Sequence, residues 1–357
     1  MPIERRRRAR QAGVGLVLLG CLMGVTGGGA SGAGPARPDP FRRVDDAMRR
    51  RLRDERGGAL VMVHDRTLLH RRTFGSFRTT TRLPIASASK WLTAATLMTL
   101  VDDGHVSLDE PVSRVLTDFG GPNASITIRS LLSHTSGLPD ADCVGDPLTT
   151  LAGCVHVIAQ STPAHPPGHV FHYSSVGYEV AARVIEVATG EPFERAFEDR
   201  IGAPVGMVHT RFDELGRGRT PNPDPAASAI STVDDWTRYL DMVLHLGQAN
   251  GRQVLAPSSV QDIEADQVAG LDTRADAAVQ ITNIPTYGLG VWRDVPGPMD
   301  STVVASGNGA LGFYPWVDRD HTNFGIVAVD DERGPDVAVP ASQRIARLAW
   351  TLAAALG

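Results

Sequence analysis

The feature that most constrains the fold is a strand pattern at both ends of the chain, separated by a long helical middle. Residues 58–64 and 67–70 are strand-like and meet at Asp65-Arg66, which predicts a hairpin. Strand-like segments return only after about Tyr287, at residues 287–292, 302–305, 312–317 and 323–329. A sheet therefore has to be assembled from the two termini, with the helical middle inserted beside it.

The most informative helix is predicted from Ser87 to Asp103. Its apolar residues surround the helix rather than striping one face, which predicts burial on nearly all sides. Gly104 is expected to end it. Further helices are predicted at residues 41–53, 127–133, 176–189, 234–246 and 340–356. Helices and strands that are segregated along the chain indicate the α+β class.

The first 33 residues have the composition of an export signal. A basic segment with five arginines up to Arg10 precedes an apolar stretch from Gly13 to Val25. Cleavage after the small residues near Ala33 is the favoured interpretation, and a lipid anchor at Cys21 is the alternative. Residues 34–41 are then a linker and residues 42–357 the folded domain, in a protein that is secreted or held in the periplasm or cell envelope.

Export bears on the two cysteines of the mature part, Cys143 and Cys154, which are eleven positions apart. In an oxidising compartment such a pair is expected to form a disulfide, with two free buried thiols as the alternative. Closing so short a loop contributes about 3 kcal/mol at most. The bond would hold a surface loop rather than the whole fold.

The charge pattern limits the class of ligand. The formal net charge is -5, and no long acidic or basic run follows residue 60. Neither a nucleic-acid partner nor a polybasic membrane patch is therefore expected. A small molecule or a peptide-like substrate remains, and the histidines show no spacing that predicts a metal site.

The chemistry is predicted at Ser87-Ala88-Ser89-Lys90, where the buried helix begins. Residues three apart share a helical face, so the Lys90 amine can reach the Ser87 hydroxyl. Burial disfavours a charged amine, and a neutral amine can take the hydroxyl proton. Lys90 is the only lysine among 35 lysines and arginines. Because arginine cannot be deprotonated in a protein, this one titratable amine indicates a catalytic base beside a nucleophilic serine.

Three segments together resemble the serine β-lactamase and penicillin-binding-protein-like superfamily. They are Ser87 to Lys90, the run Leu131 to Pro139 (LLSHTSGLP), and the run Pro166 to Tyr178. The resemblance covers roughly residues 42–350 and is strongest to class C β-lactamases, D-Ala-D-Ala carboxypeptidases and related esterases. It implies a five-stranded antiparallel sheet flanked by helices, an inserted helical lobe, and an active site between them.

The same resemblance assigns the remaining site residues. Tyr173 takes the position of the tyrosine that shuttles protons with the lysine. Ser175 stands where the family has asparagine, so its role is either substrate binding or a cap on the following helix. The family's third motif, Lys-Thr-Gly or His-x-Gly, corresponds to residues 305–310, which contain neither lysine nor histidine. There the N–H of Gly309 or Ala310 could join that of Ser87 as an oxyanion hole.

These residues predict two-stage hydrolysis without a metal or an organic cofactor. Ser87 attacks a carbonyl, Lys90 and Tyr173 move the proton, and water releases the acyl group. The chain departs from the family in having Ser175 in place of asparagine and no lysine or histidine at residues 305–310. These changes remove the groups that recognise an amide and a carboxylate. An esterase or general acyl hydrolase is therefore favoured. The alternatives are a β-lactamase or D-Ala-D-Ala carboxypeptidase acting on a peptidoglycan-like peptide, and a sensor that is acylated without turnover.

Overall fold

The computed structural model describes residues 39–52, 57–212, 220–298 and 302–356. The predicted export signal, the alternative anchor at Cys21 and most of the predicted linker lie outside these residues. Among the described residues, no helix has the length and apolar character needed to cross a membrane.

Six strands form one antiparallel sheet that joins the two ends of the chain. Its order is β2-β1-β11-β10-β9-β8, so the N-terminal strand β1 pairs directly with the last strand, β11. The strands are β1 (Gly57–His64), β2 (Thr67–Gly75), β8 (Trp292–Pro296), β9 (Thr302–Ser306), β10 (Tyr314–Asp318) and β11 (Asn323–Val329). The α+β class and the assembly from both termini are confirmed, but the sheet has six strands where five were expected.

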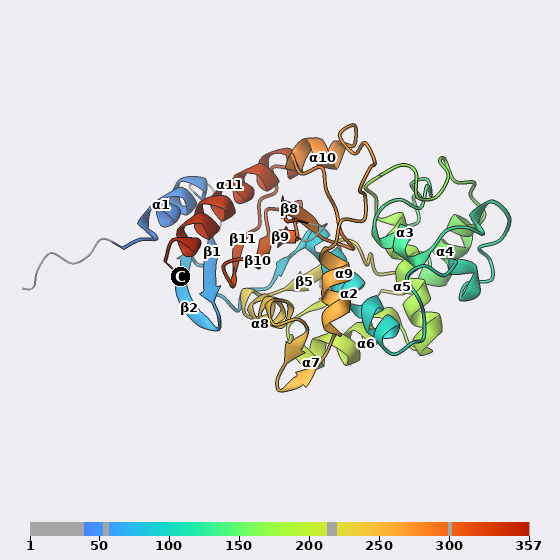
Figure 1. The fold of residues 1–357 in the computed structure, drawn as a ribbon, viewed down its shortest axis with the longest axis horizontal. Coiled ribbons are helices and arrows are strands. Elements are labelled where there is room, and N and C mark those ends of the chain that lie inside the picture. Colours follow the sequence, from blue (N-terminus) through green and yellow to red (C-terminus); the bar gives the residue numbers. More distant parts are fainter. Residues whose placement is uncertain (1–38, 53–56, 213–219, 299–301, 357) are drawn as a thin grey trace, which may run out of the picture. The chain divides into compact units, whose positions relative to one another are not determined.

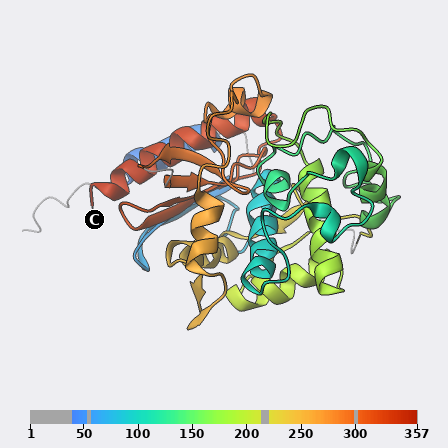
Figure 2. The same ribbon diagram turned by 45° about the vertical axis from the view of Figure 1, so that its right-hand side comes forward.

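Helices cover both faces of this sheet (Figures 1 and 2). Side chains alternate across β1, so that Leu60 and Met62 pack toward α1 (Arg42–Arg51) and α11 (Pro335–Ala354). Val61 and Val63 face the opposite core, which includes residues of α2 (Ser89–Asp102) and α8 (Val233–Leu244). A strand with apolar residues on both sides is what a sheet between two helical layers requires.

The helical lobe is inserted between β2 and β8. Its helices are α3 (Ile128–Leu132), α4 (Leu151–Ala159), α5 (Val176–Thr189), α6 (Phe193–Phe197), α7 (Ala203–Val205), α9 (Pro257–Glu264) and α10 (Ala277–Thr282), with the single turns η2 (Ala86–Ala88), η3 (Val112–Arg114), η4 (Gly121–Asn123) and η5 (Glu198–Gly202). Two small sheets accompany them, β3 (Leu83–Pro84) with β5 (Ala229–Ser231) and β4 (Arg211–Phe212), and the hairpin β6 (Gln248–Ala249) with β7 (Arg252–Gln253).

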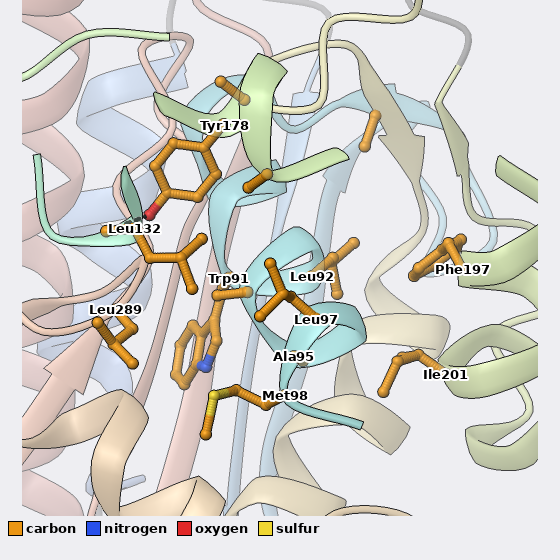
Figure 3. Packing of buried hydrophobic residues seen from close by; sticks show 14 of the residues in the cluster. Trp91, Leu92, Ala95, Leu97, Met98, Leu132, Tyr178, Phe197, Ile201 and Leu289 are labelled. Carbon is orange, nitrogen blue, oxygen red and sulfur yellow. Dashed lines mark hydrogen bonds between the residues drawn. The ribbon is translucent and has the colours of Figure 1, made fainter. Parts of the chain in front are cut away.

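Helix α2 is enclosed on all sides, as its sequence predicts. Trp91, Leu92 and Leu97 each have no exposed surface, and they pack among residues of α5, α6 and the segment before β8 (Figure 3). Gly104 follows the helix with a left-handed backbone, at φ 73°. The enclosed helix gives its first turn, which carries the candidate site, a fixed position between the sheet and the lobe.

The predicted hairpin is present, since β1 pairs with β2 in antiparallel register and His64 lies opposite Thr67. The two turn residues, Asp65 and Arg66, both have positive φ, at 38° and 64°. Such a two-residue turn matches the twist of antiparallel strands. The Cys143–Cys154 disulfide is present as well. It ties the loop before α4 to that helix.

Two predicted elements are wrong in their limits. The strand expected at residues 287–292 begins only at Trp292, because Gly290 has φ 86° and its Cα approaches the Lys90 carbonyl so closely that a Cβ would lie 2.7 Å from that oxygen. The closing helix begins at Pro335 rather than Pro340, which lies inside it. Pro335 occupies the first turn, where proline is tolerated, and Gly334 ahead of it supplies the break in the chain.

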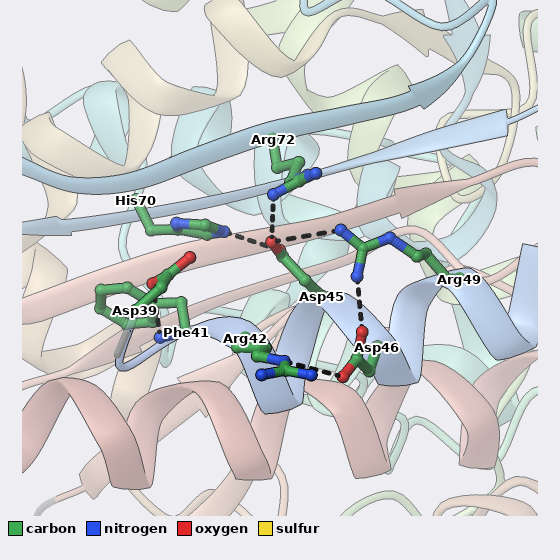
Figure 4. Close-up of polar contacts among 8 residues, drawn as sticks. All are labelled: Asp39, Phe41, Arg42, Asp45, Asp46, Arg49, His70 and Arg72. Atoms are coloured by element: carbon green, nitrogen blue, oxygen red, sulfur yellow. Dashed lines mark hydrogen bonds and ion pairs between the residues drawn. The ribbon is translucent and has the colours of Figure 1, made fainter. Parts of the chain in front are cut away.

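Helix α1 is fixed to the sheet through a buried carboxylate, which with its partners we call the Asp45 cluster (Figure 4). Asp45 is 1% exposed. Its two oxygens accept from Arg72 and His70 on β2, each at 2.8 Å, and Arg49 lies 4.0 Å away. A carboxylate removed from water in this way has to be paired with donors, and here it is.

Candidate active site

Ser87 lies on a strained turn between β3 and α2. The residue before it, Ala86, has φ 45°, a conformation that residues with a side chain rarely adopt. The turn is held from within by Ser89, whose hydroxyl donates to the Ala86 carbonyl at 2.6 Å and accepts from the Ala229 N–H at 3.1 Å. Ser87 is half-buried as a result. The backbone of this turn fixes the direction of the Ser87 hydroxyl.

Lys90 lies one turn further along and faces Ser87. Its side chain is buried, at 2% exposure, and its Nζ lies 3.3 Å from Ser87 Oγ. The Nζ also donates to the Ala226 carbonyl at 3.3 Å. Asp224 holds Ala226 in place, because the Asp224 carboxylate accepts from the Ala226 N–H at 2.8 Å. The spacing of three thus produces the contact that the sequence predicts, and a distant turn supplies the second partner of the amine.

Tyr173 completes the group around the amine. Lys90 Nζ lies 4.6 Å from the centre of the Tyr173 ring, a cation–π distance. The ring stacks on Trp292 with centroids 5.3 Å apart, and the Tyr173 N–H donates to Asp276 at 2.9 Å. The contact described between Lys90 and Tyr173 is therefore with the ring face. Tyr173 and Ser87 line the same cavity.

Behind Tyr173 lies His134, a neutral imidazole in an aromatic cluster. Its ring is 4.4 Å from that of Tyr173, and Nδ1 accepts from the Ser174 N–H at 3.2 Å. The proton is then on Nε2, which donates to the Tyr287 hydroxyl at 3.3 Å. Burial, followed by the charges of Lys90 and His172, holds the pKa of His134 well below its ordinary value. Its contacts support the position of Tyr173.

Two carboxyl groups lie in the same part of the core. Burial, and then the charge of Asp224, raises the pKa of Glu179 to about 9, and neither of its carboxyl oxygens has a hydrogen-bond partner among the described residues. Burial also raises the pKa of Asp224, while the nearby Lys90 charge and backbone N–H groups lower it. Glu179 is therefore uncharged at neutral pH.

The cavity beside Ser87 is small and carries no charged side chain. Its volume is about 70 Å³, well below the several hundred Å³ of a typical ligand pocket. Residues of α10 and of the first part of α11 close it from one side. The lining consists of Ser87, Tyr173, Ala278, Ile281, Thr282, Trp292, Asn308, Ala310, Pro335 and Val339.

Comparison with known proteins identifies the family. The family model described as Beta-lactamase matches residues 44–349. The chain belongs to the beta-lactamase family. Penicillin-binding protein 4 of Amycolatopsis lactamdurans is 31% identical over 282 residues, which cover 68% of this chain and 73% of that protein.

Solved structures of the family share the fold. A Bacteroides dorei protein whose structure carries a provisional β-lactamase designation superposes with a TM-score of 0.76 at 29% identity, covering 85% of this chain and 97% of that one. A family VIII carboxylesterase superposes with a TM-score of 0.70 at 15% identity, covering 88% of this chain and 97% of that one. At such low identity the second likeness concerns the fold alone.

Of the substrate-binding residues suggested by the family, the structure brings only Ala310 to the cavity. The Gly309 N–H donates to the Phe313 carbonyl at 2.8 Å, which occupies the donor that an oxyanion hole would need. Ser175 is absent from the cavity lining. The idea that its side chain caps α5 is wrong, because it makes no cap hydrogen bond and its backbone is already helical, at φ -87° and ψ -17°.

The segment that corresponds to the family's third motif contains Asn308, a cavity residue that was not predicted from the sequence. Ser306, at the end of β9, is fully buried and turned toward Asp294 rather than toward Ser87. Two residues later, Asn308 lines the cavity. The one signal in the sequence is a polar residue between Gly307 and Gly309. No cluster of three or more His, Cys, Asp or Glu side chains within the described ranges could hold a metal ion.

Proposed function

We propose that this protein is an exported serine hydrolase that cleaves an uncharged ester through an acyl-enzyme on Ser87. The observation that carries the proposal is the buried Lys90 amine 3.3 Å from the Ser87 hydroxyl, at the edge of a cavity without charged side chains. The family supports a hydrolase, and the geometry supports the assignment of its nucleophile and base.

In the proposed reaction, Ser87 Oγ forms a bond to the ester carbonyl carbon while Lys90 takes the hydroxyl proton. The negative oxygen that develops is stabilised by N–H groups, with Ala310 as one donor. The carbon–alkoxide bond then breaks, and the leaving alcohol receives the proton by way of Lys90 and Tyr173. Water repeats the sequence on the acyl-enzyme, releases a carboxylic acid and regenerates Ser87.

The cavity supports the choice of substrate. A carboxylate on the substrate would need a cationic partner when it is removed from water, and the described lining offers none. A volume of about 70 Å³ suits a short acyl group. A small neutral ester therefore fits better than a β-lactam or a D-Ala-D-Ala peptide, both of which carry a carboxylate.

One finding favours the second candidate function. The A. lactamdurans relative is named a penicillin-binding protein and is 31% identical to this chain. If this chain has the same activity, Ser87 should react with a β-lactam. A stable adduct without turnover would instead identify the sensor that the sequence leaves open.

Export is part of the proposal. The basic and apolar N-terminal segment supports it, and so does the Cys143–Cys154 disulfide, because such bonds persist in oxidising compartments. The folded domain is proposed to span residues 42–357. The mass of the mature chain distinguishes cleavage near Ala33 from a lipid anchor at Cys21.

The deciding experiment is hydrolysis of 4-nitrophenyl acetate by the chain without its export signal. We expect Ser87→Ala to lower kcat/KM by about 10³-fold or more, because the nucleophile is lost. Ser161→Ala, at a serine two residues beyond the end of α4, is the matched control and should retain full activity. Hydrolysis that persists in Ser87→Ala, or no hydrolysis by the wild type, would contradict the proposal.

A further inference from the structure

Asn308 combines three properties that few residues of a folded protein share. Its side chain is 5% exposed, it lines the cavity that contains Ser87, and its Nδ2 has no hydrogen-bond partner among the described residues. A buried amide nitrogen without an acceptor is unfavourable, so native structures rarely contain one without a reason. A ligand in the cavity could provide the missing acceptor.

The orientation of this amide is set from behind by Ser306. The Ser306 hydroxyl lies 3.0 Å from Asn308 Oδ1 and is also hydrogen-bonded to Asp294 Oδ2. Tyr314 donates to the other Asp294 oxygen at 2.6 Å. Ser306 has one proton, which it shares between the Asp294 carboxylate and the Asn308 carbonyl.

Asp294 lies behind Ser306 and accepts from it. Burial raises the pKa of the Asp294 carboxyl, while hydrogen bonds from Ser306, Tyr314 and Gln343 and the charge of Arg347 lower it. The carbonyl oxygen of Asn308 is the amide atom that faces Ser306, and the amide nitrogen is the atom without a partner.

We propose that Asn308 is a substrate-binding residue whose amide nitrogen donates to an uncharged oxygen of the bound substrate, with Ser306 as its positioning residue. The inference rests on the proposed function for the nucleophile, and it names the chemistry of recognition. In the segment that corresponds to the family's third motif, which has no lysine or histidine in this chain, Asn308 presents a neutral donor. A carbonyl or ether oxygen satisfies such a donor fully, whereas a carboxylate would keep most of its charge uncompensated.

The direct test compares Asn308→Asp with wild type on 4-nitrophenyl acetate. The aspartate has the same shape and lacks the donor, so we expect kcat/KM to fall about 10- to 100-fold. The matched control is Asn323→Asp, because Asn323 on β11 is also buried with an Nδ2 that lacks a partner but does not line this cavity. An unchanged kcat/KM in Asn308→Asp, or an equal loss in Asn323→Asp, would overturn the proposal.

Ser306→Ala tests the positioning role. It frees the Asn308 carbonyl and lets the amide rotate, so we expect a loss of about 3- to 10-fold that appears in KM more than in kcat. The double variant Ser306→Ala with Asn308→Asp should be no worse than Asn308→Asp alone. Independent, multiplying losses would mean that Ser306 does not act through Asn308.

Failure of the proposed function can be told apart from failure of this inference. If the wild type does not hydrolyse the ester, Asn308 is tested by the rate at which a neutral fluorophosphonate labels Ser87, followed by mass spectrometry. The P=O group of that reagent offers the same kind of acceptor. Slower labelling in Asn308→Asp than in wild type supports the inference without any turnover, and equal rates contradict it.

Discussion

The Asp45 cluster and the cavity beside Ser87 both bury polar groups, but they satisfy them differently. In the Asp45 cluster both oxygens of the carboxylate accept from side chains of β2, at 2.8 Å each. In the cavity, Asn308 Nδ2 has no partner in the described part of the chain, and the strained Ala86 holds Ser87 at the surface of a void. The Asp45 cluster joins α1 to β2, whereas the cavity contains a buried donor, Asn308 Nδ2, without an acceptor.

This difference separates stability from function. An unpartnered buried donor costs about 1–3 kcal/mol, a large part of the free energy of unfolding of an ordinary domain. The Asp45 cluster carries no such cost and can be explained by the attachment of α1. The cavity retains the cost, which is reasonable where a bound molecule offsets it. Substitutions in the cavity should therefore change activity more than stability, and those in the cluster the reverse.

The largest effect expected from this contrast is in Lys90→Arg. The charge is kept but the guanidinium cannot give up a proton, so we expect kcat/KM for 4-nitrophenyl acetate to fall about 10³-fold, or ~4 kcal/mol in the barrier. Lys90→Gln should be equally inactive. Substantial activity in the arginine variant alone would show that Lys90 acts as a positive charge and not as a base.

A smaller and opposite effect is expected in Asp45→Asn. The amide has no charge and keeps only one acceptor oxygen for the two donors His70 and Arg72, and because Arg72 is 44% exposed, water replaces part of the interaction. We expect a loss of about 2 kcal/mol in the free energy of unfolding, with kcat/KM unchanged. The control Asp46→Asn, on the same helix and 40% exposed, should cost less than about 0.5 kcal/mol. Equal costs in the two variants would remove the contrast between cluster and surface.

The last effect is expected in Glu179→Gln and depends on pH. With a folded-state pKa of about 9 against an ordinary value of 4.5, the folded chain keeps a proton that the unfolded chain releases. Stability due to this group therefore falls as pH rises from about 4.5 to 9. The glutamine variant lacks that fall, so its stability relative to wild type should increase from pH 5 to pH 8.

Urea unfolding at the two pH values measures this gain. Glu191→Gln, an exposed glutamate just beyond α5, is the control and should be close to neutral at both. A gain of Glu179→Gln over wild type that is no larger at pH 8 than at pH 5 would mean that Glu179 is ionised and paired.

Much of the fold could be predicted because its signals are local. Helix α5 was predicted at residues 176–189 and spans them in the structure, since a 3.6-residue apolar pattern and Gly190 mark its limits. The β8 limit could not be predicted, because it depends on the approach of Gly290 to Lys90, two hundred residues apart in the chain. In the candidate site, the Ser87–Lys90 contact followed from a spacing of three, whereas Asn308 was missed. Nothing in its neighbours along the chain indicates that its amide lacks a partner.

The sequence by itself determined the elements whose causes lie within a few residues: the amphipathic helices, the Asp65-Arg66 turn and the serine and lysine on one helical face. Only the tertiary structure decided how the amine is surrounded and what the cavity recognises. The Ala226 carbonyl reaches Lys90 across 136 positions, and Asn308 and the closing residues of α10 and α11 meet Ser87 from the far end of the chain. Such contacts depend on the packing of whole layers, and a neutral cavity is a property of that packing rather than of any short segment.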